Sequence, residues 1–213
     1  MGSGKGKTRR VRASATVGGT NVGDVEPTLV IANDGAQELR LGGGDGELHC
    51  EHGPAVIGPD GDEHWYLHGE CHREDGPAEK LADGSKVWRE HGLLHREDGP
   101  AVERSDGTTE WWANGKQHRE GGPAVIHSNY SEWWLNGLRH RVGGPAIERV
   151  NGDRQWWVNG GKHREDGPAV ITADGNKYYW LNNEQVTEEE VRQFFMLKRL
   201  SELRVETPEK VTF

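Results

Sequence analysis

Short apolar segments alternate along most of the chain with polar turn dipeptides, and the pattern repeats. The unit around residue 111 shows its parts: a Trp pair precedes Asn114-Gly115, and His118-Arg119 and then Gly-Pro-Ala-Val follow. Asn-Gly and Asp-Gly favour tight hairpin turns because both turn positions need positive φ. Each unit therefore predicts two strands, an aromatic strand before the turn and a His-Arg strand after it. Pro-Ala-Val-Ile then extends or caps the second strand.

The Gly-Pro-Ala sequence fixes the period of the repeat. Self-similarity at a period of roughly 20 to 50 residues is typical of repeat architectures. We therefore predict an all-β fold, an elongated single-layer stack of about six 23-residue β-hairpin repeats with a C-terminal capping α-helix. The steps between copies are 23, 23, 23, 22 and 23 residues, and the copies begin at Gly53, Gly76, Gly99, Gly122, Gly144 and Gly167.

Two aromatic columns run through the repeats, and because neighbouring side chains on a strand point to opposite faces, they differ in environment. The first column is aromatic in every copy, so we expect it to form the core: Trp65, Trp88, Trp111, Trp133, Trp156 and Tyr179. The second column admits Tyr66 and Arg89, which indicates an exposed or half-covered face. Its later members form the predicted interaction face: Trp112, Trp134, Trp157 and Trp180. The Ala of Gly-Pro-Ala never varies, which indicates no room beyond Cβ.

A histidine stands four residues before each Gly of Gly-Pro-Ala. A catalytic base or metal ligand is needed once per site, whereas this residue recurs in one register, so we interpret it as repeat-building. We expect its ring to stack on the Trp columns and to hydrogen-bond the next turn, and the following Arg to pair with the Glu or Asp of His-Arg-Glu-Asp. A binding ladder for an extended or anionic partner stays open. The histidines are His49, His72, His95, His118, His140 and His163.

The sequence predicts no catalytic residue, no metal ligand and no cofactor. Successive His positions should lie about 10 Å apart, two strand spacings, which is too far for a shared zinc ion. The two cysteines, Cys50 and Cys71, fall in different columns of the repeat, which argues against a disulfide or a zinc pair. No signal peptide and no long apolar run is present, so we expect a soluble protein of the cytoplasm that is not secreted.

The chain ends differ from the repeats, so the sequence divides into four parts. Residues 29–48 are a degenerate repeat or cap, residues 49–186 are the array, and residues 187–213 are a capping helix and tail. Thr187 and Glu190 form a predicted capping box, and the helix carries an apolar stripe. The helix covers the last hairpin, serves docking or homo-oligomer formation, or does both.

Residues 1–28 form the remaining part and have the composition of a disordered basic arm. The arm is either a solvated tail or a contact for nucleic acid or an acidic partner. Its basic residues, with no acidic residue before Asp24, are Lys5, Lys7, Arg9, Arg10 and Arg12.

The order of residues in the unit resembles the MORN repeat. The likeness rests on Trp-x-Asn-Gly-Lys-x-His followed by Gly, and it covers residues 49–183. The chain departs from that family by placing Arg after the His, where MORN repeats usually carry Gly, and by adding Gly-Pro-Ala. This variant resembles repeats of phage and large-virus proteins. The resemblance implies stacked β-hairpins, protein scaffolding or sometimes lipid contact, and no catalytic residues.

Composition and charge leave three hypotheses for function. Only 32% of the 213 residues are hydrophobic, which suits a stack in which each unit is buried against its neighbours. The net charge of −9 makes the array a poor surface for duplex DNA or anionic membranes. The leading hypothesis is a non-enzymatic scaffold that binds another protein, in a phage or viral setting. The alternative is a virion or nucleoprotein component whose basic arm binds nucleic acid or an acidic partner.

The third hypothesis, an enzyme or small-molecule binder, would require one repeat to break register and create a unique pocket. The most irregular repeats are those at Trp88-Arg89 and at Asn129. Neither gathers a catalytic set of residues in the sequence.

Overall fold

The computed structural model describes residues 27–205, which form short antiparallel strands and one helix, α1 (Glu188–Val205). The predicted all-β class with a C-terminal helix and a stack of β-hairpins is confirmed. The chain divides into two compact units, Met1–Lys116 and Gln117–Phe213, and each is described by itself.

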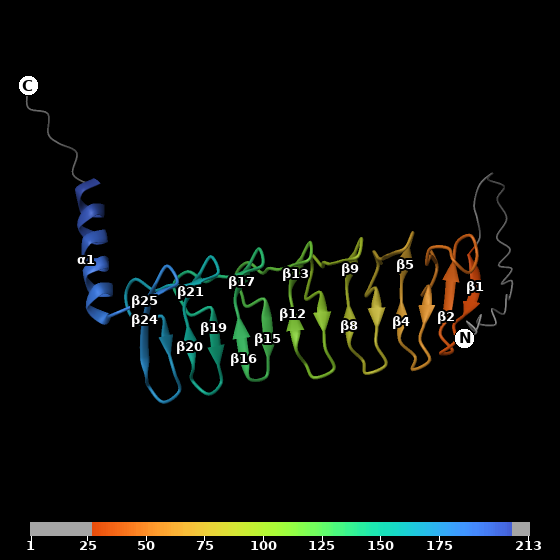
Figure 1. Ribbon diagram of the computed structural model, residues 1–213, viewed down its shortest axis with the longest axis horizontal. Helices are drawn as coiled ribbons and strands as arrows, with labels where there is room; N and C mark the ends of the chain where they lie inside the picture. The colour runs from red at the N-terminus through yellow and green to blue at the C-terminus, as the bar shows by residue number, and fades with distance from the viewer. Residues whose placement is uncertain (1–26, 206–213) are drawn as a thin grey trace, which may run out of the picture. The chain divides into compact units, whose positions relative to one another are not determined.

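The first unit contains one antiparallel sheet and a series of separate short hairpins (Figure 1). The sheet strands, in spatial order, are β1 (Thr28–Ile31), β2 (Gln37–Arg40), β3 (Val56–Ile57), β4 (Glu63–His64), β7 (Glu79–Lys80), β8 (Lys86–Val87), β11 (Val102–Glu103) and β12 (Thr109–Glu110). The short hairpins are β5 (Tyr66–Leu67) with β6 (Glu70–Cys71) and β9 (Arg89–Glu90) with β10 (Leu93–Leu94). Next come β13 (Trp112–Ala113) and β14 (Lys116–Gln117), the latter spanning the division between the units.

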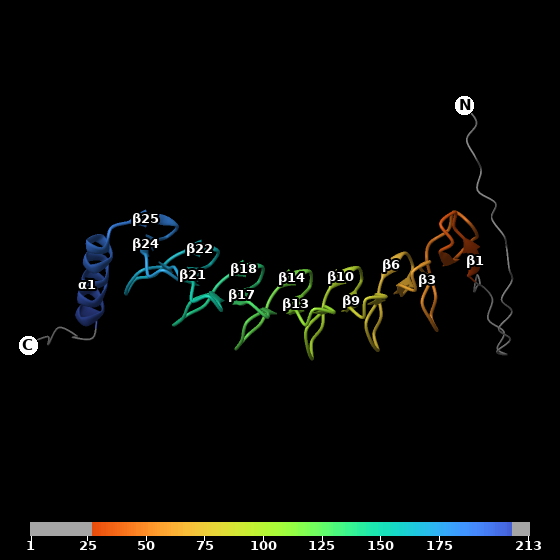
Figure 2. The same cartoon turned by 90° about the horizontal axis from the view of Figure 1, so that it is seen from below.

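The second unit repeats this arrangement and ends in α1. Its sheet strands are β15 (Val125–His127), β16 (Tyr130–Glu132), β19 (Ile147–Arg149), β20 (Arg154–Gln155), β23 (Val170–Ile171), β24 (Lys177–Leu181) and β25 (Glu184–Val186). Its short hairpins are β17 (Trp134–Leu135) with β18 (Leu138–Arg139) and β21 (Trp157–Val158) with β22 (Gly161–Lys162). In each unit the short hairpins leave the plane of the sheet (Figure 2).

Each repeat contains two hairpins, so the prediction of two strands per unit was wrong. In the repeat at Trp88, β7 and β8 pair around Asp83-Gly84, and β9 and β10 pair around His91-Gly92. The chain leaves the sheet at Trp88, whose backbone N–H donates to the Ala101 carbonyl over 2.8 Å. The Pro-Ala-Val-Ile segment does not extend the His-Arg strand. It forms a sheet strand of its own because the His-Arg-Glu-Asp-Gly loop separates the two.

The turn dipeptides adopt the backbone that their sequence predicts. Asn114 and Gly115 have φ values of 49° and 74°, so both turn positions are left-handed. The Gly115 N–H then donates to the Leu94 carbonyl of the preceding short hairpin over 2.9 Å. This bond joins one short hairpin to the preceding one, and Gly92 makes the equivalent bond to Cys71.

The core lies along the Ala of Gly-Pro-Ala and not along the first aromatic column. The six alanines at this position, from Ala55 to Ala169, are at most 1% exposed, which confirms that no room exists beyond Cβ. In the first aromatic column only Trp65 is buried, and the other members are half-buried. A single sheet leaves solvent on the side of these rings. A ring wider than the strand spacing therefore stays partly exposed, whereas a methyl group between strands does not.

Helix α1 begins with the predicted capping box and packs on the last sheet hairpin through one side. The Thr187 N–H donates to Glu190 Oε2 over 2.7 Å, and the Glu190 N–H donates to Thr187 Oγ1 over 3.3 Å. Val191 is 3% exposed at the contact with the sheet. The predicted apolar stripe is not buried as a whole, because its remaining members are exposed: Phe194, Phe195, Leu197, Leu200 and Leu203. Among the described residues, no helix is long and apolar enough to span a membrane.

Candidate functional site

The recurring histidines join each repeat to the next, as predicted. The Nδ1 atom of His72 accepts the backbone N–H of His91 over 3.1 Å, and Nδ1 of His95 accepts that of Asn114 over 3.1 Å. The donor is always the first residue of the next short turn, whose left-handed backbone points its N–H away from its own hairpin. The same bond is made by His49, His118, His140 and His163. Accepting at Nδ1 requires the neutral ring with its proton on Nε2.

In four repeats the arginine that follows the histidine, and not the histidine, stacks on the first aromatic column. The guanidinium carbon of Arg96 lies 4.0 Å from the centre of the Trp88 ring, and Arg141 lies 3.8 Å from Trp133. The predicted stacking of histidine on Trp is therefore replaced by an arginine contact. Equivalent pairs are Arg73 on Trp65 and Arg164 on Trp156. The rings of His49 and His72 contact instead the rings of the turn residues His68 and His91.

The rest of the repeated motif holds that arginine in place. Arg96 Nε donates to Asp98 Oδ1 over 2.8 Å, and its NH1 donates to the Pro100 carbonyl over 3.2 Å. A Cβ on Gly99 would lie 3.0 Å from the guanidinium carbon, so any larger residue here would have to push the stacked arginine away. The Arg96 side chain also holds the pKa of Asp98 below its ordinary value, first through that hydrogen bond and then through its charge. The His-Arg-Glu-Asp-Gly-Pro-Ala string is therefore one packing unit.

The second aromatic column is half-buried and fixed by polar contacts. Trp134 Nε1 donates to Glu132 Oε2 over 2.9 Å, and Trp112 Nε1 donates to Glu110 Oε2 over 3.0 Å. Gln155 accepts from Trp157 in the same way. Each acceptor stands two residues before its indole, at the end of the sheet strand from which the chain bends into the short hairpin. The Trp180 Nε1 atom is buried without a partner in the described part of the chain.

In the second unit, cationic side chains lie between the rings of this column. Arg139 lies 4.7 Å from the Trp134 ring centre and 5.5 Å from that of Trp157. Lys162 lies 5.5 Å from Trp157 and 4.7 Å from Trp180. The predicted interaction face is therefore a ladder of alternating rings and cations. The sequence showed the rings, but the cations come from the opposite strand of each short hairpin and were missed.

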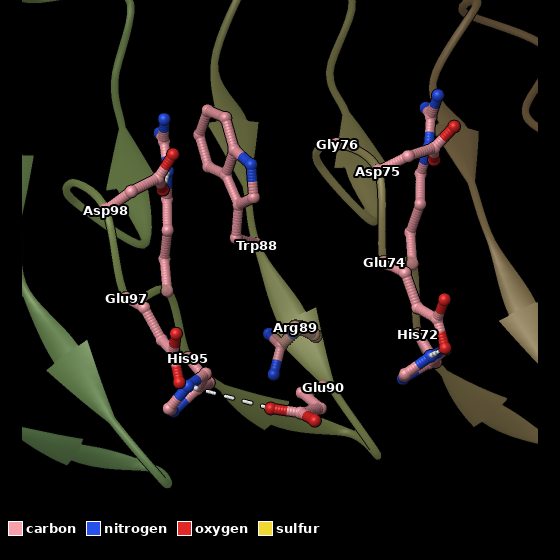
Figure 3. A pocket seen from close by; sticks show the side chains of 12 residues that line it. His72, Glu74, Asp75, Gly76, Trp88, Arg89, Glu90, His95, Glu97 and Asp98 are labelled. Atoms are coloured by element: carbon pink, nitrogen blue, oxygen red, sulfur yellow. Dashed lines mark hydrogen bonds and ion pairs between the residues drawn. The ribbon is translucent and has the colours of Figure 1, made fainter.

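A groove of about 850 Å³ lies in the first unit between two successive His-Arg-Glu-Asp-Gly loops (Figure 3). Trp88 stands in the groove, with the Asp98 loop on one side and the Asp75-Gly76 loop on the other. Glu90 points across the groove floor toward His95, and its Oε2 lies 3.6 Å from Nε2. The sequence marks this repeat as irregular at Arg89, whereas the position of Glu90 on the groove was not predicted.

Two further features are unsuited to chemistry. Burial is the largest cause that raises the pKa of the Cys71 thiol to about 12, with the neighbouring Glu79 carboxylate adding to it, so this thiol stays protonated and unreactive. Within residues 27–205, no group of three or more His, Cys, Asp or Glu side chains is arranged to hold a metal ion.

The predicted arm residues Lys5, Lys7, Arg9, Arg10 and Arg12 lie outside the described residues.

Comparison with models of known protein families gave no match, and comparison with curated proteins gave no significant match.

Proposed function

We propose that this protein is a non-enzymatic, MORN-like repeat scaffold that binds another protein through its second aromatic column. The observation that supports the proposal is the ladder of half-exposed rings and cations at Trp134, Arg139, Trp157, Lys162 and Trp180. Rings fixed by hydrogen bonds lose little side-chain entropy on binding, and Trp and Arg are the residues most enriched at binding hot spots. The phage or viral setting, in host cytoplasm or virion, belongs to the proposal through the resemblance alone.

The chain itself offers a substitution that removes rings and keeps the fold. Arg89 stands in this column in its own repeat, where its Nε donates to the Glu79 carboxylate. Trp112→Arg and Trp134→Arg place a guanidinium beside Glu110 and Glu132, which already accept from the indole at those positions. We expect the double variant to melt close to wild type and to lose its protein partner.

The experiment compares partner capture from the native host by the wild-type protein and by the double variant. Val150→Arg is the matched control, because Val150 is 76% exposed and outside the column. Loss of one defined partner in the double variant alone supports the proposal, and equal capture by all three proteins contradicts it. A form that lacks residues 1–28 tests the alternative, in which the basic arm carries binding. Loss of recovered nucleic acid or protein only in that form would move function to the arm.

A further inference from the structure

Glu90 is the one charged residue in a column that is otherwise apolar. The position after the second aromatic residue holds Leu67, Glu90, Ala113, Leu135, Val158 and Leu181 in the six repeats. The apolar members are half-buried, whereas the Glu90 side chain is 55% exposed and faces the groove beside Trp88 (Figure 3). A residue needed to build the repeat should recur, and Glu90 does not. The column itself therefore does not require a carboxylate here, although Glu90 lies 3.6 Å from His95 Nε2.

The groove carries more negative than positive charge, and its arginines are already paired. Arg73 and Arg96 each bond the Asp of their own loop over 2.8 Å, and Arg89 bonds Glu79. Glu74 and Glu90 contact only histidines among the described residues, at 4.0 Å from His72 and 3.6 Å from His95, and for Glu97 no partner is found there. These three carboxylates face a shared space and have no lysine or arginine partner in residues 27–205.

The Trp88 ring supplies a second element of the site. Arg96 covers one face of the ring at 4.0 Å. The opposite face looks into the groove toward Gly76, which has no side chain, and the Asp75 side chain beyond it points outward at 84% exposure (Figure 3). A ring face with nearby carboxylates is the environment in which the protein already holds its own arginines, each stacked on a Trp and bonded to an Asp.

We propose that this groove binds a basic segment of a partner protein, with one lysine or arginine side chain stacked on the open face of Trp88 and another paired with Glu90 on the groove floor. Charge complementarity selects the cation, and the ring face together with the Gly76 gap selects a flat or slender group. The site lies in the first unit and uses none of the residues of the proposed Trp ladder. It therefore goes beyond the proposed scaffold function, and the result of its test does not depend on that function.

The test measures binding of a fluorescein-labelled hexa-arginine peptide by fluorescence anisotropy. A hexa-citrulline peptide, which keeps the shape and lacks the charge, is the ligand control. The key variant is Glu90→Leu, because leucine is the residue that other repeats carry at this position, so we expect unchanged or higher thermal stability. We expect its affinity for hexa-arginine to fall about tenfold or more, since a charge-assisted hydrogen bond is lost.

Glu184→Gln is the matched control, because it removes an exposed carboxylate from β25 in the other unit, outside the groove. We expect it to bind hexa-arginine like wild type. If Glu90→Leu fails to fold, a Glu74→Gln/Glu97→Gln double variant tests the same groove, because both residues lie on exposed loops. Its affinity for hexa-arginine should also fall. The proposal is overturned if wild type does not bind hexa-arginine, if hexa-citrulline binds equally well, or if the groove variants bind like Glu184→Gln.

Discussion

The histidine bond between repeats gives the sharpest prediction about stability, and His72 is the place to test it. His72 is 6% exposed, and its Nδ1 accepts the His91 N–H over 3.1 Å. The substitution His72→Phe keeps a ring of similar size and removes the acceptor, so the His91 N–H is left without its partner in a partly buried turn. Leaving such a donor unpaired costs about 1–3 kcal/mol.

The magnitude follows from that single bond, because the other polar contact of the ring is weak. His72 Nε2 lies 4.0 Å from Glu74, whose side chain is 91% exposed, and an exposed pair of this kind adds little. A loss of about 2 kcal/mol corresponds to a fall of roughly 4–8 °C in the melting temperature for a protein of this size. His72→Asn is expected to recover part of the loss, since its amide oxygen can accept a hydrogen bond near the position of Nδ1.

The assay combines thermal melting by circular dichroism with amide hydrogen exchange at His91. The control is His52→Phe, because the His52 side chain is 94% exposed and accepts no backbone hydrogen bond from the residues that the structure describes. We expect faster exchange at His91 and a lower melting temperature in His72→Phe, with little change in His52→Phe. If His72→Phe melts like wild type and the His91 amide exchanges at the wild-type rate, the histidine does not join the repeats energetically.

Three more predictions concern single positions. Tyr178 stands two residues before Trp180, as Gln155 stands before Trp157, from whose Nε1 it accepts a hydrogen bond. Tyr178→Gln should therefore accept from the buried Trp180 Nε1 and raise the free energy of unfolding in denaturant melts by about 1 kcal/mol, whereas Tyr178→Leu should not. The Lys198 hydrogen bond is the main cause that lowers the pKa of Glu165, so this pair stabilises helix docking above about pH 4 and loses that effect as pH falls through the lowered pKa. The rate of proteolytic cleavage within α1 should therefore rise at acid pH in the wild-type protein and depend less on pH in Glu165→Gln. In a Cys50→Ser background, Cys71 should react with a thiol reagent at pH 8 far more slowly than the unfolded chain, because its pKa is raised to about 12, and equal rates would contradict its burial.

Local chemistry explains which parts of the fold the sequence predicts. Asn114-Gly115 and its equivalents have almost no alternative to a left-handed turn, and an alanine that never varies indicates a position without space. The bond from each histidine to the next turn was likewise expected from recurrence alone. The turns and the alanine position depend on a residue and its immediate neighbours, whereas the bond between His72 and His91 joins residues 19 apart and is indicated by recurrence alone.

The features that the sequence does not predict depend on where the strand path bends. The prediction of opposite faces for neighbouring side chains assumed that one strand continues through Trp88, but the chain leaves the sheet there and starts a second hairpin. The bend decides that arginine, and not histidine, reaches the ring, and that the first aromatic column stays half-exposed. It also brings Glu90 to the groove floor, a position that no count along the strand reveals.

Recurrence separates the two kinds of residue in this molecule. His95, Arg96, Gly99 and Ala101 belong to a motif that the repeats share, and the structure gives each a packing or hydrogen-bonding reason. Glu90 departs from its column and lies on a groove, where its one ion pair among the described residues is with His95 Nε2 at 3.6 Å. In a stack of similar units, a surface that recurs in several repeats suits an extended partner that spans them, whereas a contact confined to one repeat requires a departure from the pattern. In the first unit the Glu90 groove supplies such a departure.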